Sequence, residues 1–171
     1  MRQAPQFLLV GEIRDADTLS AALQLGESGQ LVLATMHATN CERAIERIEA
    51  LGARQAELVR SQLAGSLIGV VAQALLPRLT GGRVLAAEVM TVTHGIAASI
   101  RGGNVVDLRS AMRNPSEPGT QVRMAISLAG LVRDQTLSLA DARAAAYDLE
   151  EFESVRSRRE LPRGCGGTIA R

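Results

Sequence analysis

Two short apolar runs, separated by an amphipathic helix pattern, constrain the fold of this chain more than any other feature. Residues 7–10 read Phe-Leu-Leu-Val and are followed by Gly11, and residues 31–36 read Leu-Val-Leu-Ala-Thr-Met and are followed by His37. Continuous apolar runs of this length are typical of strands that are covered on both faces. A strand, a helix and a second strand within about 30 residues form a βαβ unit, which places both strand ends at one edge of a parallel sheet.

The segment between the two runs has the start and stop signals of a helix. Asp15 or Asp17 can cap its first turn, and Gly26 or Gly29 can end it. Its apolar positions recur at helical spacing, at Leu19, Ala22, Leu23 and Leu25.

The chain that follows predicts two more helices and a hairpin. Asn40 caps a helix that Gly52 stops, and another helix covers about residues 54–67. Residues 68–76 are either the end of that helix or a buried strand. A proline and two glycines then mark a turn before a strand at residues 83–90, so a hairpin across this turn is favoured.

The back half of the chain shows helical patterns only, with a proline-containing break at residues 114–119. The helices are expected at about 94–101, 105–112, 122–133 and 138–147. The chain then becomes rich in arginine and glycine, which indicates a disordered tail. The predicted organisation is an α/β part over residues 1–92, a helical part over 93–152 and a tail over 153–171.

Composition and charge exclude several classes of function. The 171 residues carry 19 basic and 18 acidic side chains, and this near-neutral balance argues against a general nucleic-acid binder. Aromatic residues make up only 2%, which argues against recognition of bases by stacking. Every basic residue is arginine, so this chain holds no P-loop lysine and no Schiff-base lysine.

Other patterns bear on the compartment. Cys41 and Cys165 are too few for a disulfide scaffold and wrongly spaced for zinc, which indicates a reducing, cytoplasmic setting. The amino-terminal segment lacks the long apolar stretch of a signal peptide. Residues 61–77 are uncharged but at the short limit for crossing a bilayer, so burial in a soluble core is favoured.

The polar residues that follow the two apolar runs form the candidate site. In open α/β sheets ligands bind beyond the carboxyl ends of the strands, where Glu12 and His37 stand. An apolar run closed by an acid is the Walker B pattern, in which a carboxylate holds a magnesium-bound water or activates the attacking water. Taken alone, the pattern also fits a solvated acid in a turn. Arg14 and Asp15 either position each other by a charge-assisted hydrogen bond or form an ordinary exposed pair.

Two motifs make this interpretation more specific. Residues 9–15 read Leu-Val-Gly-Glu-Ile-Arg-Asp, and residues 35–40 read Thr-Met-His-Ala-Thr-Asn. Together they resemble the secretion and twitching-motility ATPases of type II secretion and type IV pili, in which a Walker B segment is followed by a histidine box. The resemblance continues at residues 70–77, Val-Val-Ala-Gln-Ala-Leu-Leu-Pro, and at residues 82–90, Gly-Arg-Val-Leu-Ala-Ala-Glu-Val-Met, and it covers residues 2–152.

Within that family the retraction branch is the most similar. Residues 95–102 stand where this branch carries an Ala-Ile-Arg-Asn-Leu-Ile-Arg-Glu helix, although Gly102 replaces the terminal acid and Ala97 the first arginine. The resemblance implies an α/β fold: part of a RecA-like P-loop NTPase core with a mainly parallel sheet, followed by a helical carboxyl-terminal subdomain. It also implies ATP and Mg²⁺ as ligands, a hexameric homo-oligomer, and partners in the inner-membrane pilus or secretion machinery, which would hold a cytoplasmic motor at that membrane.

The resemblance further implies roles for the strand-end residues. Glu12 would be the catalytic acid that acts on water and holds Mg²⁺ through water. His37 would sense the γ-phosphate or couple it to movement between subunits. Gly11, Arg14 and Asp15 would support the nucleotide and magnesium site.

Family members carry a small domain, a P-loop (Walker A) and an aspartate-rich box before the Walker B strand, and none of these is in this sequence. The chain is therefore expected to be the carboxyl-terminal part of a motor, with an open sheet edge and apolar faces. Two function classes stay open: a motor ATPase, and an inactive remnant or assembly module that keeps the fold but cannot bind nucleotide alone. A third, a Glu/His hydrolase or metal protein, lacks a second histidine near Glu12.

Overall fold

The computed structural model describes residues 7–113 and 121–158 of the chain. In chain order the elements are β1 (Phe7–Val10), α1 (Ala16–Glu27), β2 (Leu31–Ala34), α2 (Cys41–Leu51), the 3-10 helix η1 (Ala53–Gln55), α3 (Ala56–Ser66), β3 (Gly69–Pro77), β4 (Arg83–Thr91), α4 (His94–Gly102), α5 (Val105–Arg113), β5 (Gln121–Val122), α6 (Met124–Arg133), α7 (Leu139–Ala145) and α8 (Leu149–Ser157). None of the described helices is long and apolar enough to cross a membrane.

The predicted βαβ unit is present at the start of the chain. β1 and β2 pair in parallel, with Phe7 opposite Leu31 and Val10 opposite Ala34, and α1 connects them. The capping signals work as expected, because the Asp15 side chain accepts a hydrogen bond from the backbone N–H of Thr18 at the start of α1. The α/β class expected from the sequence is therefore confirmed.

The hairpin favoured at residues 68–90 is confirmed, and it makes the second sheet antiparallel rather than part of a mainly parallel sheet. β3 and β4 pair along their whole length in antiparallel register, and the short β5 pairs antiparallel with β4. The physical reason is the turn between β3 and β4, where Gly81 and Gly82 have positive φ angles and the chain reverses directly. So short a connection can join only antiparallel neighbours. Residues 68–76, which the sequence left open between helix and strand, are thus largely strand.

The two parallel strands are less covered than their apolar runs suggest. Val10 and Val32 pack against the first core, but Phe7, Leu9, Leu31 and Leu33 are 46% to 69% exposed. The expectation that these strands are covered on both faces is wrong within the described residues. Because α1 packs on one side of this two-stranded sheet, the other side keeps its apolar side chains in solvent, as expected for an open sheet.

The back half is helical, with two differences from the sequence pattern. The helix expected from residue 122 begins at Met124, because Gln121 and Val122 pair with β4 as β5. α8 runs to Ser157, past the expected start of the tail, and it buries Phe152 and Val155. Those two apolar positions lie three residues apart on one helical face. The break at 114–119 and the tail from 159 onward lie outside the described residues.

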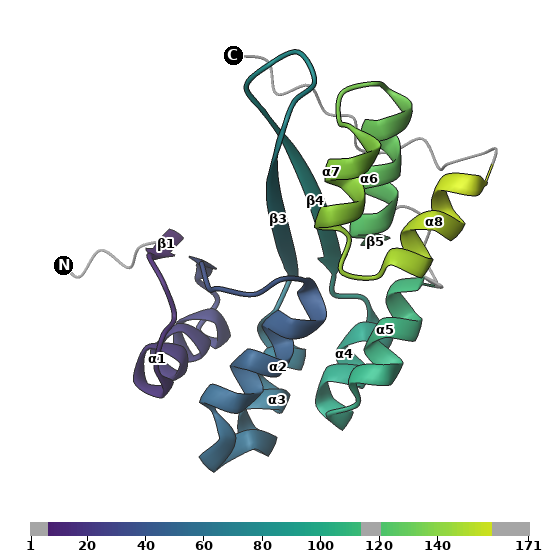
Figure 1. Ribbon diagram of the computed structural model, residues 1–171. Helices are drawn as coiled ribbons and strands as arrows, with labels where there is room; N and C mark the ends of the chain where they lie inside the picture. The colour runs from purple at the N-terminus through teal and green to yellow at the C-terminus, as the bar shows by residue number, and fades with distance from the viewer. Residues whose placement is uncertain (1–6, 114–120, 159–171) are drawn as a thin grey trace.

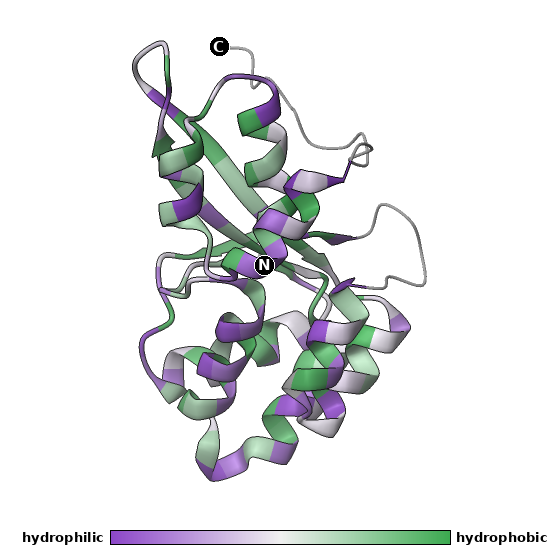
Figure 2. Ribbon diagram, turned by 45° about the vertical axis from the view of Figure 1, so that its right-hand side comes forward, coloured by the Kyte–Doolittle hydropathy of each residue, from purple (hydrophilic) through white to green (hydrophobic). Residues whose placement is uncertain are grey.

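The buried side chains form two cores that meet at β4. The first core lies among α1–α5 and includes Ile45 and Met90, and the second lies among α6–α8 and includes Phe152 and Ala86. Figure 1 shows these as a lower and an upper group of helices beside the β3–β4 hairpin. Figure 2 shows much of that hairpin in green, the colour of hydrophobic residues. The domain boundary after residue 92 stays a prediction. The helices α4 and α5 follow that residue, and they pack in the first core.

Candidate functional site

The parallel register brings the segments after β1 and β2 side by side. The backbone N–H of Ile13 donates to the carbonyl of Thr35 at 2.9 Å, and the Thr35 hydroxyl donates to the carbonyl of Gly11. These bonds extend the pairing beyond the strands themselves. They bring the acid of the first motif close to the histidine of the second, with His37 Nε2 lying 3.4 Å from Glu12 Oε1.

Arg14 is the other partner of the Glu12 carboxylate. Its Nη2 donates to Glu12 Oε2 at 2.5 Å, and this hydrogen bond holds the pKa of Glu12 below its ordinary value. Of the two alternatives left open for Arg14 and Asp15, the pairing of the two side chains with each other does not form, because Asp15 caps α1. The hydrogen bond from the backbone N–H of Thr18 lowers the pKa of Asp15. Arg14 and Asp15 therefore serve different partners, one the acid and the other the helix.

The exposure of these side chains leaves them open to a ligand. The His37 side chain is 84% exposed and that of Glu12 is 21% exposed. In proteins, Mg²⁺ is commonly held by one or two carboxylates, substrate phosphates and several waters. Glu12 fits that kind of binding through water. The described residues contain no group of three or more His, Cys, Asp or Glu side chains that could enclose a metal, and the chain contains no lysine for a phosphate.

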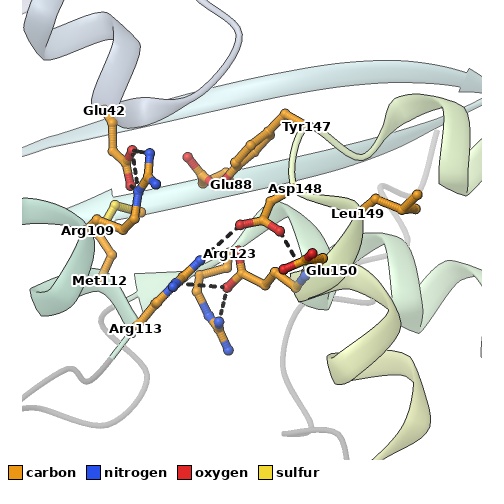
Figure 3. A pocket seen from close by; sticks show the side chains of 11 residues that line it. Glu42, Glu88, Arg109, Met112, Arg113, Arg123, Tyr147, Asp148, Leu149 and Glu150 are labelled. Carbon is orange, nitrogen blue, oxygen red and sulfur yellow. Dashed lines mark hydrogen bonds and ion pairs between the residues drawn. The ribbon is translucent and has the colours of Figure 1, made fainter. Parts of the chain in front are cut away.

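A second polar region lies between the two cores, where a cavity of about 300 Å³ opens (Figure 3). Arg109 donates to Oε2 of the Glu42 carboxylate from Nε at 3.0 Å and from Nη2 at 2.7 Å. The buried Glu88 lies beside this pair. The cavity is lined by Glu42, Glu88, Arg109, Met112, Arg113, Arg123, Tyr147, Asp148, Leu149, Glu150 and Glu151.

The sequence motif around residues 82–90 contained Glu88, but sequence reasoning gave it no role. A signal was present, since Glu88 stands between Ala86 and Met90 in the alternation of β4, at a position whose neighbours two residues away are apolar. The pairing of Arg109 with Glu42 joins residues 67 positions apart and had no such signal.

Together, the βαβ unit, an acid and a histidine at adjacent strand ends, and the helical region that follows define an α/β protein with a candidate site at the ends of its parallel strands. The family model described as "Type II/IV secretion system protein" matches residues 1–93, more than half of the chain. The chain belongs to this family, and the resemblance read from its motifs is confirmed.

Its relatives include pilus motors. The type IV pilus retraction ATPase PilT of Pseudomonas aeruginosa is 37% identical over 153 residues, which is 89% of this chain and 44% of PilT. A twitching motility protein of Neisseria gonorrhoeae is 34% identical, over 89% of this chain and 41% of the relative. The crystal structure of the pilus retraction motor PilT with bound ADP matches with a TM-score of 0.80 at 34% identity, over 90% of this chain and 43% of that one. The chain thus spans less than half the length of these relatives.

Proposed function

We propose that this chain carries the hydrolytic acid and the phosphate-responsive histidine of a motor ATPase that drives type IV pilus retraction or pilus-like secretion. The observation that carries the proposal is the 3.4 Å approach of His37 to Glu12 across the ends of two parallel strands. The pilus ATPases among its relatives support the same assignment.

The proposed roles follow from the contacts of each residue. Arg14 favours the ionised form of Glu12, so that Oε1, the oxygen that Arg14 does not contact, can orient a water or accept its proton. His37 is exposed enough to reach a phosphate while it stays beside Glu12. The Gly11 carbonyl and the Asp15 cap fix the turn that carries Glu12. When bound, ATP would supply the phosphoryl group that water attacks, and Mg²⁺ would neutralise the charge on it.

The complete motor, in this proposal, is a homohexamer in the cytoplasm that the pilus or secretion machinery holds at the inner membrane. Because the chain contains no lysine, the lysine of a P-loop must come from another segment or chain. The 171 residues alone should therefore bind ATP weakly or not at all. A micromolar or tighter dissociation constant for ATP in calorimetric titration would contradict this expectation.

A fusion of these 171 residues to the amino-terminal part of Pseudomonas aeruginosa PilT tests the roles directly. Glu12→Gln should keep ATP binding and assembly but lower turnover by roughly 10² to 10⁴, the usual range for a positioned acid–base group. His37→Ala should weaken the link between hydrolysis and movement more than hydrolysis itself. Glu27→Gln, an exposed acid on α1, is the matched control.

The outcome separates the two candidate functions. Turnover in the parent fusion, lost in Glu12→Gln, supports the motor. Equal turnover in Glu12→Gln leaves Glu12 a structural acid only. A folded fusion that assembles but never hydrolyses ATP supports the second candidate, an inactive assembly module, which the absence of lysine favours.

A further inference from the structure

Glu88 lies where the two cores meet. It is the middle of three alternate residues of β4 that are all buried, between Ala86 of the second core and Met90 of the first. Glu88 itself is only 1% exposed. A carboxylate in such a place is costly unless hydrogen bonds satisfy its oxygens, so its partners show what it does.

The partners of Glu88 are hydrogen-bond donors from three distant parts of the chain. The backbone N–H of Cys41 donates to Oε1 at 2.8 Å, and the backbone N–H of Met124 donates to Oε2 at 3.2 Å. The hydroxyl of Tyr147, in the link between α7 and α8, also donates to Oε2 (Figure 3). The arginines nearby pair with other acids, Arg109 with Glu42 and Arg123 with Glu151.

Both backbone donors are the first residues of helices. Cys41 begins α2 and Met124 begins α6, so one carboxylate sits at the amino-terminal ends of two helices at once. First-turn N–H groups lack partners inside the helix, and the helix dipole favours a negative charge there. The residue before α6, Arg123, makes no side-chain cap of its own, so Glu88 takes that place from a neighbouring strand.

We propose that Glu88 is a positioning residue that clamps the starts of α2 and α6 together, so that the two cores move as one body. α2 begins four residues after His37, and the clamp therefore ties the histidine segment to the helical core of α6–α8. A shift of His37 would reach that core through Cys41, Glu88 and Met124. The part of this inference that concerns His37 rests on the proposed function, but the clamp does not.

Amide hydrogen exchange measured by NMR on the 171-residue chain tests the clamp without nucleotide. The two amides donate to different oxygens of Glu88, and glutamine keeps only one of these as an acceptor, so Glu88→Gln should release one helix start. Exchange at either Cys41 or Met124 should therefore rise by about 10-fold to 100-fold, the range expected when a charged hydrogen bond is lost. Glu153→Gln, which removes a partly exposed carboxylate on α8 that pairs with Arg143 and Arg156, should change neither amide.

A second variant tests whether a change at the start of α2 reaches the start of α6 through Glu88. Asn40 caps α2 through the backbone N–H of Arg43, so Asn40→Ala should fray the start of α2. In the parent this should raise exchange at Met124 several-fold, whereas in Glu88→Gln it should add nothing. Thr93→Ala removes the cap of α4, another helix of the first core, and should leave Met124 unchanged.

Two results would overturn the proposal. One is that Glu88→Gln leaves both amides as protected as Glu153→Gln does. The other is that Asn40→Ala affects Met124 equally with and without Glu88, which would mean that the cores communicate by another route. Since Tyr147 is the one tyrosine of the chain, its ultraviolet spectrum reports in the same samples whether the Glu88 contact persists. Failure of the fusion to hydrolyse ATP would leave these results unaffected.

Discussion

Glu12 follows a strand of the parallel sheet, Glu88 lies within the antiparallel sheet, and the two acids have opposite surroundings. Glu12 follows β1, keeps 21% of its side chain exposed, and pairs with the charged or chargeable groups of Arg14 and His37. Glu88 lies within β4, is 1% exposed, and accepts from two backbone amides and a hydroxyl. The first arrangement leaves a carboxylate that can bind a ligand. The second uses both carboxylate oxygens to hold three donors together at the wall of the cavity.

The two sites also differ in what a substitution disturbs. Water can replace a partner of Glu12, because exposed ion pairs are screened and contribute little to folding. The loss of Glu88 leaves two first-turn amides and a hydroxyl without their acceptor, which costs more than the loss of an exposed ion pair. Function at the first site and stability at the second should therefore separate cleanly under mutation.

Of the substitutions at the two sites, replacement of Glu88 by leucine should lower the stability of the protein most. It removes the acceptor of two first-turn amides and a hydroxyl, and we expect the free energy of unfolding to fall by about 3 to 5 kcal/mol. Urea denaturation followed by circular dichroism measures this loss. Glu12→Gln should leave the urea midpoint nearly unchanged, and equal losses in the two variants would contradict the distinction between the sites.

Cys41 offers a chemical test of the same interior. Burial, followed by the charge of Glu88, raises the pKa of its thiol to about 12. In a Cys165→Ser chain, Cys41 should react with iodoacetamide at pH 8 about 1000-fold more slowly when folded than when unfolded in urea. Mass spectrometry of timed samples gives both rates. A folded thiol that reacts at the unfolded rate would mean that the interior around Glu88 is open.

The ionisation of Tyr147 gives a test of the Glu88 site that depends on pH. Burial of its hydroxyl end and the hydrogen bond to Glu88 raise the pKa of this phenol, although 45% of the residue is exposed. The unfolded chain loses the proton first, so the contribution of Tyr147 to stability is present below its ordinary value of about 10 and is lost at higher pH. Ultraviolet titration should show ionisation shifted downward in Glu88→Gln. An unshifted curve would show that the contact does not control this group.

The smallest effect is expected at Glu12. Its pKa is lowered mainly by the hydrogen bond from Arg14, so Arg14→Ala should raise it toward the ordinary value of 4.5. The stabilisation from this pair is present above that value and is lost as the pH falls through the lowered pKa. NMR titration of the Glu12 carboxyl carbon follows the change. Arg43→Ala, which removes an exposed ion pair on α2, should leave the Glu12 curve in place.

Much of the local structure could be predicted from the sequence because its causes are local. Asp15 and Asn40 cap helices through bonds to residues three positions away, and glycines with positive φ close the β3–β4 hairpin. The adjacency of Glu12 and His37 also followed, since parallel pairing brings two strand ends to one edge. α8 was missed because its apolar positions are few and stand among charged residues.

The sequence by itself determined the βαβ unit, the order of the elements other than β5 and α8, and the pair of side chains at the strand ends. Only the tertiary structure decided that Arg14 pairs with Glu12 rather than with Asp15, that one face of β1 and β2 is exposed, and that Glu88 joins α2, α6 and Tyr147. Helix caps and strand periodicity act within a few residues, so a single sequence displays them. The partners of Glu88 lie 36 to 59 positions away, and they meet only when β4 sits between two packed cores.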